Sequence, residues 1–266
     1  MTVKHTVQLK NITLGDGFPK ICVPVLGGTE GEILEQARVA AGAEPDLVEW
    51  RADFYGGITD YGKAAGVLSA LSEILGQIPI LFTFRTGREG GNREISPEEY
   101  RELNLWAASR AETDLVDVEG RWPELQADRL TEAVHRMGKP VVASSHFFDR
   151  TPGRPELVSV FEELRDTGAE ILKVAVMPES REDVLELLRV TLEMDRRLPN
   201  PLISMSMGIL GGISRASGCL TGSALTFGAA GTVSASGPPP VSEIRRTMAL
   251  ISYFSLKLSQ LLLFRT

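Results

Sequence analysis

One pattern recurs eight times along this chain: a short apolar run, rich in β-branched residues, that ends in a polar or charged residue. The runs follow one another mostly at intervals of about 25 to 35 residues, which is the length of one strand–helix unit. Their continuous apolar character is typical of strands buried on both faces of a parallel sheet. The eight expected strands are Ile21–Val25, Asp46–Arg51, Pro79–Arg85, Leu115–Glu119, Pro140–His146, Ile171–Met177, Leu202–Met207 and Leu225–Gly228.

Helical patterns fill the intervals between these runs. Ser96–Pro97 begins one helix with an N-cap residue and a proline at the first helical position, and Ser180 begins another with a capping box. Gly138 and Gly168 are typical C-terminal stop residues. The expected helices are Glu32–Ala41, Asp60–Leu75, one that begins after Ser96, Leu125–Met137, Pro155–Thr167, Ser180–Met194 and Val241–Gln260.

Eight strands that alternate with helices predict an α/β protein, a (β/α)8 TIM barrel. A doubly wound open sheet is the competing arrangement, and it is less favoured because no Gly-x-Gly-x-x-Gly motif follows the first strand. Barrels of this type reach about 250 residues as one domain. No Pro/Gly/Ser linker divides the chain, so we expect a single domain over residues 1–266.

The residues before the first strand, 1–17, alternate in polarity. Val7, Leu9, Ile12 and Leu14 are apolar around Lys10-Asn11, a pattern that indicates a small β-hairpin within Thr6–Gly17. We expect this hairpin to close the bottom of the barrel, at the N-terminal ends of the strands.

The composition excludes several classes of protein. With 43% hydrophobic and 24% charged residues, the chain can bury a full core and is not intrinsically disordered. A net charge of −7 argues against nucleic acid and against an anionic membrane surface as partners.

The chain also carries no sign of export. No apolar run reaches the roughly 18 residues of a transmembrane helix, and Met1–Val7 lacks the features of a secretory signal. The two cysteines, Cys22 and Cys219, cannot form a disulfide framework and are expected to be reduced. We therefore predict a cytoplasmic protein.

Active sites of such barrels lie at the C-terminal ends of the strands. Polar or sulfur-containing side chains at or near those ends are therefore candidates, and they are Glu49, Arg51, Arg85, Glu119, His146 and Met207.

Lys173 departs from this pattern because it lies within a strand and not at its end. Alternation places Lys173 on one face with Ile171, Ala175 and Met177, so the amine should point into the barrel. A lysine is almost never fully buried without a partner or a function. Burial and cations nearby, such as Arg51, would lower the pKa of the amine, and a neutral amine can form a Schiff base with a ketone. The alternative is a lysine that only pairs with an acid.

His146 ends the preceding strand, so its tip should lie beside that of Lys173. Histidine titrates near neutral pH and is suited to proton transfer, although a purely structural histidine is the alternative. Glu89 follows Arg85 by four residues and could orient the imidazole, or it could be a solvated loop charge.

Three further features are candidates for holding a substrate. Arg215 could clamp a carboxylate, as two parallel hydrogen bonds from a guanidinium allow. Glu49 and Arg51 share a strand face and could form a buried pair, for the substrate or for structure alone. The Gly-rich segment 228–237 could bind phosphate, a carboxylate or hydroxyls. The sequence shows no metal-ligand spacing such as Cys-x-x-Cys or His-Glu-x-x-His, so no metal is expected.

Six motifs, in order along nearly the whole chain, carry a family resemblance. Together they resemble type I 3-dehydroquinate dehydratase. They are Glu49-Trp-Arg-Ala-Asp53, Phe82-Thr-Phe-Arg-Thr86 with Glu89-Gly-Gly91, Ser144-Ser-His146, Gly168–Pro178, Ser204–Gly208 and Ser223–Phe227.

This resemblance implies a barrel enzyme of the shikimate pathway, usually a homodimer and without a cofactor, that removes water from 3-dehydroquinate. Lys173 would form the imine, His146 would be the general acid and base, and Glu89 would be its partner. The resemblance further implies that the substrate is bound by Glu49, Arg51, Arg85, Arg215, Met205, Phe227, Ser234 and Ala235.

Three positions depart from the family pattern. Pro238 stands where a substrate-binding glutamine is usual, Phe147 where Asp or Asn follows the histidine, and Pro24 where a serine is sometimes found. Proline has neither a side-chain amide nor a backbone N–H, so we expect a raised KM before any loss of chemistry. Two alternatives stay open: another Schiff-base lyase such as a class I aldolase for sugar phosphates, and an impaired barrel kept as a binding module.

Overall fold

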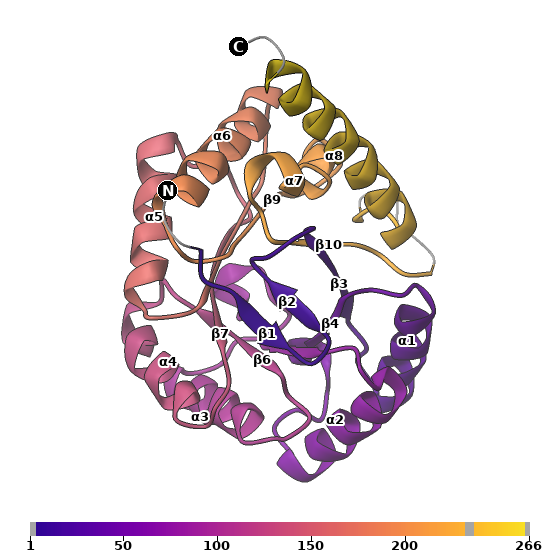
Figure 1. Ribbon diagram of the computed structural model, residues 1–266. Helices are drawn as coiled ribbons and strands as arrows, with labels where there is room; N and C mark the ends of the chain where they lie inside the picture. The colour runs from indigo at the N-terminus through magenta and orange to yellow at the C-terminus, as the bar shows by residue number, and fades with distance from the viewer. Residues whose placement is uncertain (1–3, 232–236, 264–266) are drawn as a thin grey trace.

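The computed structural model describes residues 4–231 and 237–263, with side chains described as far as Phe254. It contains one sheet of eight parallel strands surrounded by helices, and one short antiparallel hairpin (Figure 1). The parallel strands are β3 (Lys20–Val25), β4 (Leu47–Arg51), β5 (Ile80–Thr83), β6 (Leu115–Glu119), β7 (Val141–Phe147), β8 (Ile171–Val176), β9 (Leu202–Ser206) and β10 (Leu225–Phe227).

The sheet closes into a barrel. Its strand order is β10-β3-β4-β5-β6-β7-β8-β9, and the two outer strands meet where the amide of Ala224 donates to the carbonyl of Leu202 at 2.7 Å. All eight expected strands are present, so the predicted (β/α)8 barrel is confirmed. Strand β5 ends earlier than expected, because the amide of Arg85 donates to the Asp53 carboxylate instead of to a neighbouring strand.

The helices form a ring outside the strands (Figure 1). Thr29, Ser96 and Ser180 each begin a helix with a capping box, which confirms the predicted starts at Ser96 and Ser180. The helices are α1 (Glu30–Gly42), α2 (Tyr61–Leu75), α3 (Pro97–Ala108), α4 (Ala127–His135), α5 (Arg154–Asp166), α6 (Arg181–Arg197), α7 (Gly218–Thr221) and α8 (Val241–Leu263).

Two helices differ from the expectation. Helix α4 was expected from Leu125, but Pro123–Leu125 forms a 3-10 turn, η3, and Gln126 with φ of 52° separates it from the helix. Helix α7 is only one turn long and was not predicted, because four residues are too short for a periodic pattern.

The hairpin consists of β1 (Val7–Leu9) and β2 (Ile12–Leu14), and it crosses the middle of the barrel in Figure 1. Its apolar side chains Val7, Leu9 and Leu14 pack in one cluster with residues at the beginnings of the strands, such as Leu47 and Leu115. This contact confirms the predicted hairpin and its position across the bottom of the barrel.

Two apolar layers result from the alternation of side chains along each strand. Outward residues, such as Val48, Val116 and Val174, pack with the helices in a large outer cluster. Inward residues form a smaller inner cluster that includes Ile171 and Ala175. Within the described part of the chain, no helix is both long and apolar enough to cross a membrane.

Candidate active site

Lys173 points into the barrel. It lies between Ile171 and Ala175, both members of the inner cluster, whereas its neighbours Leu172 and Val174 belong to the outer one. Only 4% of its surface is exposed. The predicted inward orientation is therefore confirmed, and it follows from the alternation of the strand alone.

The surroundings of Lys173 differ from the expectation. Its Nζ lies 3.2 Å from Asp117 Oδ2 and 3.4 Å from Glu49 Oε1, and 4.6 Å from the centre of the Phe227 ring. The sequence predicted cations such as Arg51 and Arg85 near this amine. The groups in direct contact with it are two carboxylates, and Arg51 and Arg85 are both bound by acids of their own.

His146 and Glu89 form a close pair. His146 lies near the end of β7, and Glu89 ends a 3-10 turn, η2 (Gly87–Glu89), after β5. The imidazole Nδ1 is 2.8 Å from Glu89 Oε2, and the ring of Phe148 stacks on the imidazole at 6.3 Å between centroids. The sequence had left open whether Glu89 was a solvated charge, and the structure brings it to the histidine.

Burial and charge set the protonation of this pair. Burial lowers the pKa of His146 well below its usual value, and the positive charges of Arg85, Lys173 and Arg51 lower it further. Burial also raises the pKa of Glu89 to about 8, although Arg85 acts in the opposite direction. The imidazole is therefore neutral at pH 7, with a free lone pair for a proton.

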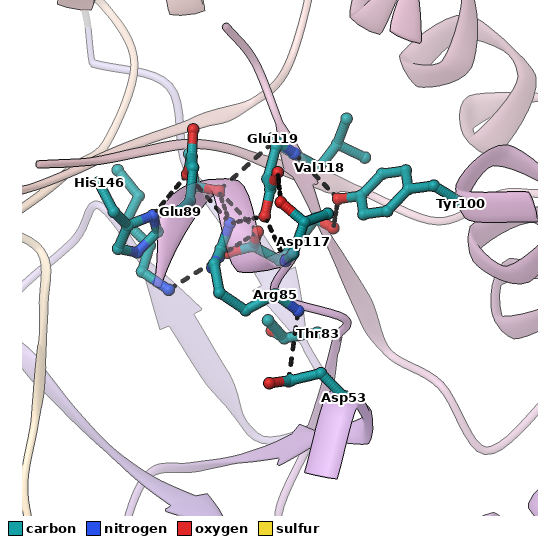
Figure 2. A network of polar contacts seen from close by, with 12 residues as sticks. Asp53, Thr83, Arg85, Glu89, Tyr100, Asp117, Val118, Glu119 and His146 are labelled. Carbon is teal, nitrogen blue, oxygen red and sulfur yellow. Dashed lines mark hydrogen bonds and ion pairs between the residues drawn. The ribbon is translucent and has the colours of Figure 1, made fainter. Parts of the chain in front are cut away.

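Arg85 is the centre of a buried network of acids beneath His146 (Figure 2). Its Nη2 donates to Asp117 at 2.6 Å, and its Nη1 donates to Glu119 at 3.1 Å, to Ser144 at 3.0 Å and to Glu89 at 3.3 Å. Three carboxyl groups thus bind one guanidinium that is only 2% exposed. Charge-assisted hydrogen bonds of this kind fix the geometry of the groups they join.

Sequence reasoning missed Asp117 as a functional candidate. It lies between Leu115 and Glu119 on the inward face of β6 and is fully buried. The alternation that singled out Lys173 would have singled out this acid as well. Apart from Lys173, the predicted candidates lay at strand ends or in loops, so Glu119 was among them and Asp117 was not.

Glu49 and Arg51 do not pair with each other. Arg51 donates to both oxygens of Asp53, at 2.8 and 2.9 Å, while Glu49 accepts from Thr83 Oγ1 at 2.9 Å and contacts Lys173. The expected Glu49–Arg51 ion pair was wrong, because Arg51 is paired with Asp53, and Glu49 contacts Thr83 and Lys173 instead.

Arg215 lies on the far side of the lumen, in the turn after β9 (η4, Gly212–Arg215). Its Nη1 donates to the carbonyl of Phe227 at 3.1 Å and contacts Met205 Sδ at 3.8 Å. Among the described residues no carboxylate lies within ion-pair distance of it. Burial lowers the pKa of Arg215. Because this buried cation has no acidic partner among the described residues, it is available to bind an acidic ligand.

A cavity of about 180 Å³ joins these groups at the C-terminal ends of the strands. Phe148, Ala175 and Met207 are among the residues that line it. The expected site residues that line it are Lys173, His146, Glu49, Arg51, Arg85, Arg215, Met205 and Phe227. Glu89 lies behind His146, and Ser234 and Ala235 lie outside the described residues.

The three departures from the family pattern have different positions. Pro24 and Pro238 line the cavity. Phe147 does not, because it points outward from β7, where the guanidinium groups of Arg121 and Arg150 each lie 5.4 Å from its ring centre.

Fold and site together define a class of protein: a (β/α)8 barrel with a buried amine and a histidine–carboxylate pair in one cavity at the C-terminal ends of its strands. The sequence matches the Type I 3-dehydroquinase family over residues 21–255. The chain belongs to this family. The resemblance stated from the six motifs is thereby confirmed.

Relatives in sequence agree with this assignment. A 3-dehydroquinate dehydratase of Listeria welshimeri is 43% identical over 247 residues, which cover 93% of this chain and 98% of the relative. A 3-dehydroquinate dehydratase of Clostridium kluyveri is 43% identical over 250 residues, with the same coverage of both chains.

Solved structures agree as well. The type I 3-dehydroquinate dehydratase of Clostridium difficile, solved with covalently modified comenic acid, is 39% identical with a TM-score of 0.89. The 3-dehydroquinate dehydratase of Geobacillus kaustophilus is 39% identical with a TM-score of 0.90. Each comparison covers 94% of this chain and 98% of the other. An aldolase from Thermotoga maritima, at 13% identity and a TM-score of 0.60, shares the fold alone.

Proposed function

We propose that this protein is a 3-dehydroquinate dehydratase, which removes water from 3-dehydroquinate to give 3-dehydroshikimate through an imine on Lys173. The observation that carries the proposal is that a buried lysine and a neutral histidine line one cavity in a chain of this family. The covalently modified ligand in the Clostridium difficile relative supports a covalent mechanism.

The first chemical step joins the substrate to the protein. The Lys173 side chain passes one proton to His146, and its amine attacks the ketone carbon to form a C–N bond. The carbonyl oxygen takes a second proton from the nitrogen and the first one back from His146, and leaves as water. The resulting protonated imine can accept an electron pair from the neighbouring carbon. This lowers the barrier to removing an otherwise weakly acidic C–H proton.

His146 then transfers one proton in two steps. Its Nδ1 contacts Glu89, so Nε2 is the nitrogen that takes the proton from carbon. The electron pair of the C–H bond passes into the imine and returns to expel the hydroxyl group. The same Nε2 gives its proton to that hydroxyl, which leaves as water, and a second water hydrolyses the imine to release the product.

The remaining cavity residues hold the substrate. We assign the substrate carboxylate to Arg215, whose guanidinium has no acidic partner among the described residues. Glu49, Arg51, Met205 and Phe227 would contact the ring and its hydroxyls from the cavity wall. Arg85 also lines the cavity, but its guanidinium is already held by three carboxyl groups, which favours a structural role. Ser234 and Ala235 stay predictions.

Borohydride trapping tests the covalent step. Incubation with 3-dehydroquinate and borohydride should add the mass of the reduced ligand to the peptide that contains Lys173. The variant Lys173→Met should show neither adduct nor turnover in an ultraviolet assay of the conjugated enone product. Lys63→Met, which changes a lysine with a 70% exposed side chain, is the control and should behave as wild type. An adduct that persists in Lys173→Met would overturn the proposal.

Pro238 gives a second test, directed at affinity. It lines the cavity, and the family usually has glutamine there. The variant Pro238→Gln should lower the KM and change kcat little, because a restored hydrogen-bond donor acts on binding more than on chemistry. An unchanged KM would show that the proline costs this site no affinity.

We also propose that two copies of the chain associate, and that the protein acts in the cytoplasm. Leu220 on α7 and Leu250 and Phe254 on α8 are each more than half exposed, and α7 and α8 are neighbouring helices. Exposed apolar groups of this kind support a protein contact. Sedimentation should show a dimer, and the double variant Leu220→Lys, Phe254→Lys should sediment as a monomer.

A further inference from the structure

The amine of Lys173 and the imidazole of His146 are joined through the protein by an unbroken chain of side-chain contacts. Lys173 Nζ lies 3.2 Å from Asp117, Asp117 lies 2.6 Å from Arg85, and Arg85 lies 3.3 Å from Glu89. Glu89 in turn lies 2.8 Å from His146. Figure 2 shows the part of this chain from Asp117 to His146.

Asp117 is the member that connects the amine to the rest. Glu49 also contacts Lys173, but its other contact is Thr83 and not Arg85. Glu119 also contacts Arg85, but its other contact is Thr86 and not Lys173. Among the described residues, Asp117 alone has ion-pair contacts with both cations.

The position of Asp117 is itself firmly fixed. Its Oδ1 accepts hydrogen bonds from Arg85 Nη2 and Ser144 Oγ, both at 2.6 Å, while its Oδ2 faces Lys173. Burial acts to raise the pKa of Asp117, but the charges of Arg85 and Lys173 hold that pKa below its usual value. The carboxylate therefore stays ionised and keeps both contacts.

We propose that Asp117 is a positioning residue that sets the separation between the imine nitrogen and the imidazole, acting through Arg85 and Glu89. This inference rests on the proposed function. In that reaction the substrate is bonded to Lys173 while His146 must reach one C–H proton of the same molecule. A lysine stem has four rotatable bonds, so the geometry needs a fixed anchor at the nitrogen, and a misplacement of about 1 Å can cost about 100-fold in rate.

The variant Asp117→Asn tests this role, because it keeps the shape and the contact with Ser144 but removes the charge. We expect kcat to fall about 10- to 100-fold with KM within about threefold, since alignment and not binding is lost. Borohydride should still trap the substrate on Lys173, because the amine is present. Glu119→Gln removes one charge from the same strand and the same arginine without touching Lys173, and should cost less.

A double-mutant cycle separates positioning from a general loss of charge. If Asp117 acts through Glu89, the variant with both Asp117→Asn and Glu89→Gln should lose no more than the worse single variant. Additive losses in kcat would overturn the inference, as would an equal loss in Glu119→Gln. If Asp117→Asn does not fold, Ser144→Ala serves in the cycle and should lower kcat about threefold with the same coupling.

The two proposals fail differently. A wild-type protein that gives no trapped adduct on Lys173 overturns the proposed function. A normal adduct and turnover in the wild type, with Asp117→Asn as active as the wild type, overturns only the positioning role.

Discussion

The lower and upper halves of the barrel lumen are built on the same eight strands but differ in the polarity of the side chains that fill them. The lower layer is entirely apolar or sulfur-containing, and consists of Cys22, Leu47, Leu81, Leu115, Val142, Ile171, Ile203 and Leu225. Two residues further along each strand stand the members of the upper layer, which are Pro24, Glu49, Thr83, Asp117, Ser144, Lys173, Met205 and Phe227.

This comparison shows how one fold separates stability from chemistry. Strands β4 to β8 place polar groups in the upper layer, whereas β9, β10 and β3 place apolar ones there. The substrate cavity therefore has a charged wall and an apolar wall, facing each other. The lower layer needs no hydrogen-bond partners and contributes apolar burial, while the upper layer holds charges that are costly to bury unless they are paired.

The largest expected effect belongs to the upper half. The variant His146→Ala should lower kcat by about 10²- to 10⁴-fold, because a positioned acid–base group is lost. The measurement is enone absorbance under saturating substrate. Slow trapping on Lys173 should remain. Full turnover in this variant would mean that another group moves the proton.

A substitution of comparable energetic effect in the lower layer should reduce the stability of the fold and leave the reaction rate unchanged. The variant Leu115→Ala removes a buried side chain two residues below Asp117 and should lower the free energy of unfolding by about 2–5 kcal/mol. Denaturant titration measures this loss. At a temperature where the variant is folded, kcat should match the wild type within about twofold. A large loss of kcat would show that the two layers are coupled.

The protonation of Glu89 predicts a smaller, pH-dependent effect. With a folded pKa of about 8 against an ordinary value of 4.5, folded Glu89 holds a proton that the unfolded chain has released. Its contribution to stability is therefore complete below about pH 4.5 and is lost as the pH rises through about 8.

Glu89→Gln removes that dependence. Between pH 5 and 9 the variant should gain on the order of 1–3 kcal/mol relative to wild type. Paired denaturant titrations at the two pH values measure it. His146 has the opposite sign: its pKa is lowered by folding, so its contribution is lost as the pH falls below about 6.5. A constant difference between the two proteins would contradict the raised pKa of Glu89.

The smallest effect is expected outside the lumen. The variant Phe147→Asp restores the usual family residue on the outward face of β7, between Arg121 and Arg150. Two cation–π contacts would be exchanged for ion pairs, so stability should change by less than about 1 kcal/mol, with kcat and KM unaffected. A change of KM by tenfold would show that this position reaches the cavity after all.

Much of the architecture could be predicted from the sequence, because it depends on local patterns. The alternation within Ile171–Val176 was enough to orient Lys173, and capping residues were enough to begin the helices after Ser96 and Ser180. The single domain over residues 1–266 stays a prediction. Strand ends were less certain, as β5 shows, because the residues after Thr83 bind a side chain from the preceding turn.

The pairing of charges in the site could not be predicted in the same way. Arg85 binds acids 32 and 34 residues away, on a neighbouring strand, and which acid it reaches depends on the registers of both strands and on the rotamers. Local sequence shows that Glu49, Arg51 and Arg85 are near the site, but not which of them neutralise each other. The contacts that set the field at Lys173 are therefore a result of tertiary structure.

The hairpin beneath the lower layer determines how a ligand can reach the barrel lumen. Because β1 and β2 cover the end opposite the cavity, the lumen opens to solvent at the C-terminal ends of the strands. Substrate must enter, and both the expelled water and the product must leave, past the same rim residues. A side chain that narrows this opening would therefore slow the entry of substrate and the exit of product together, without contact with a reacting bond.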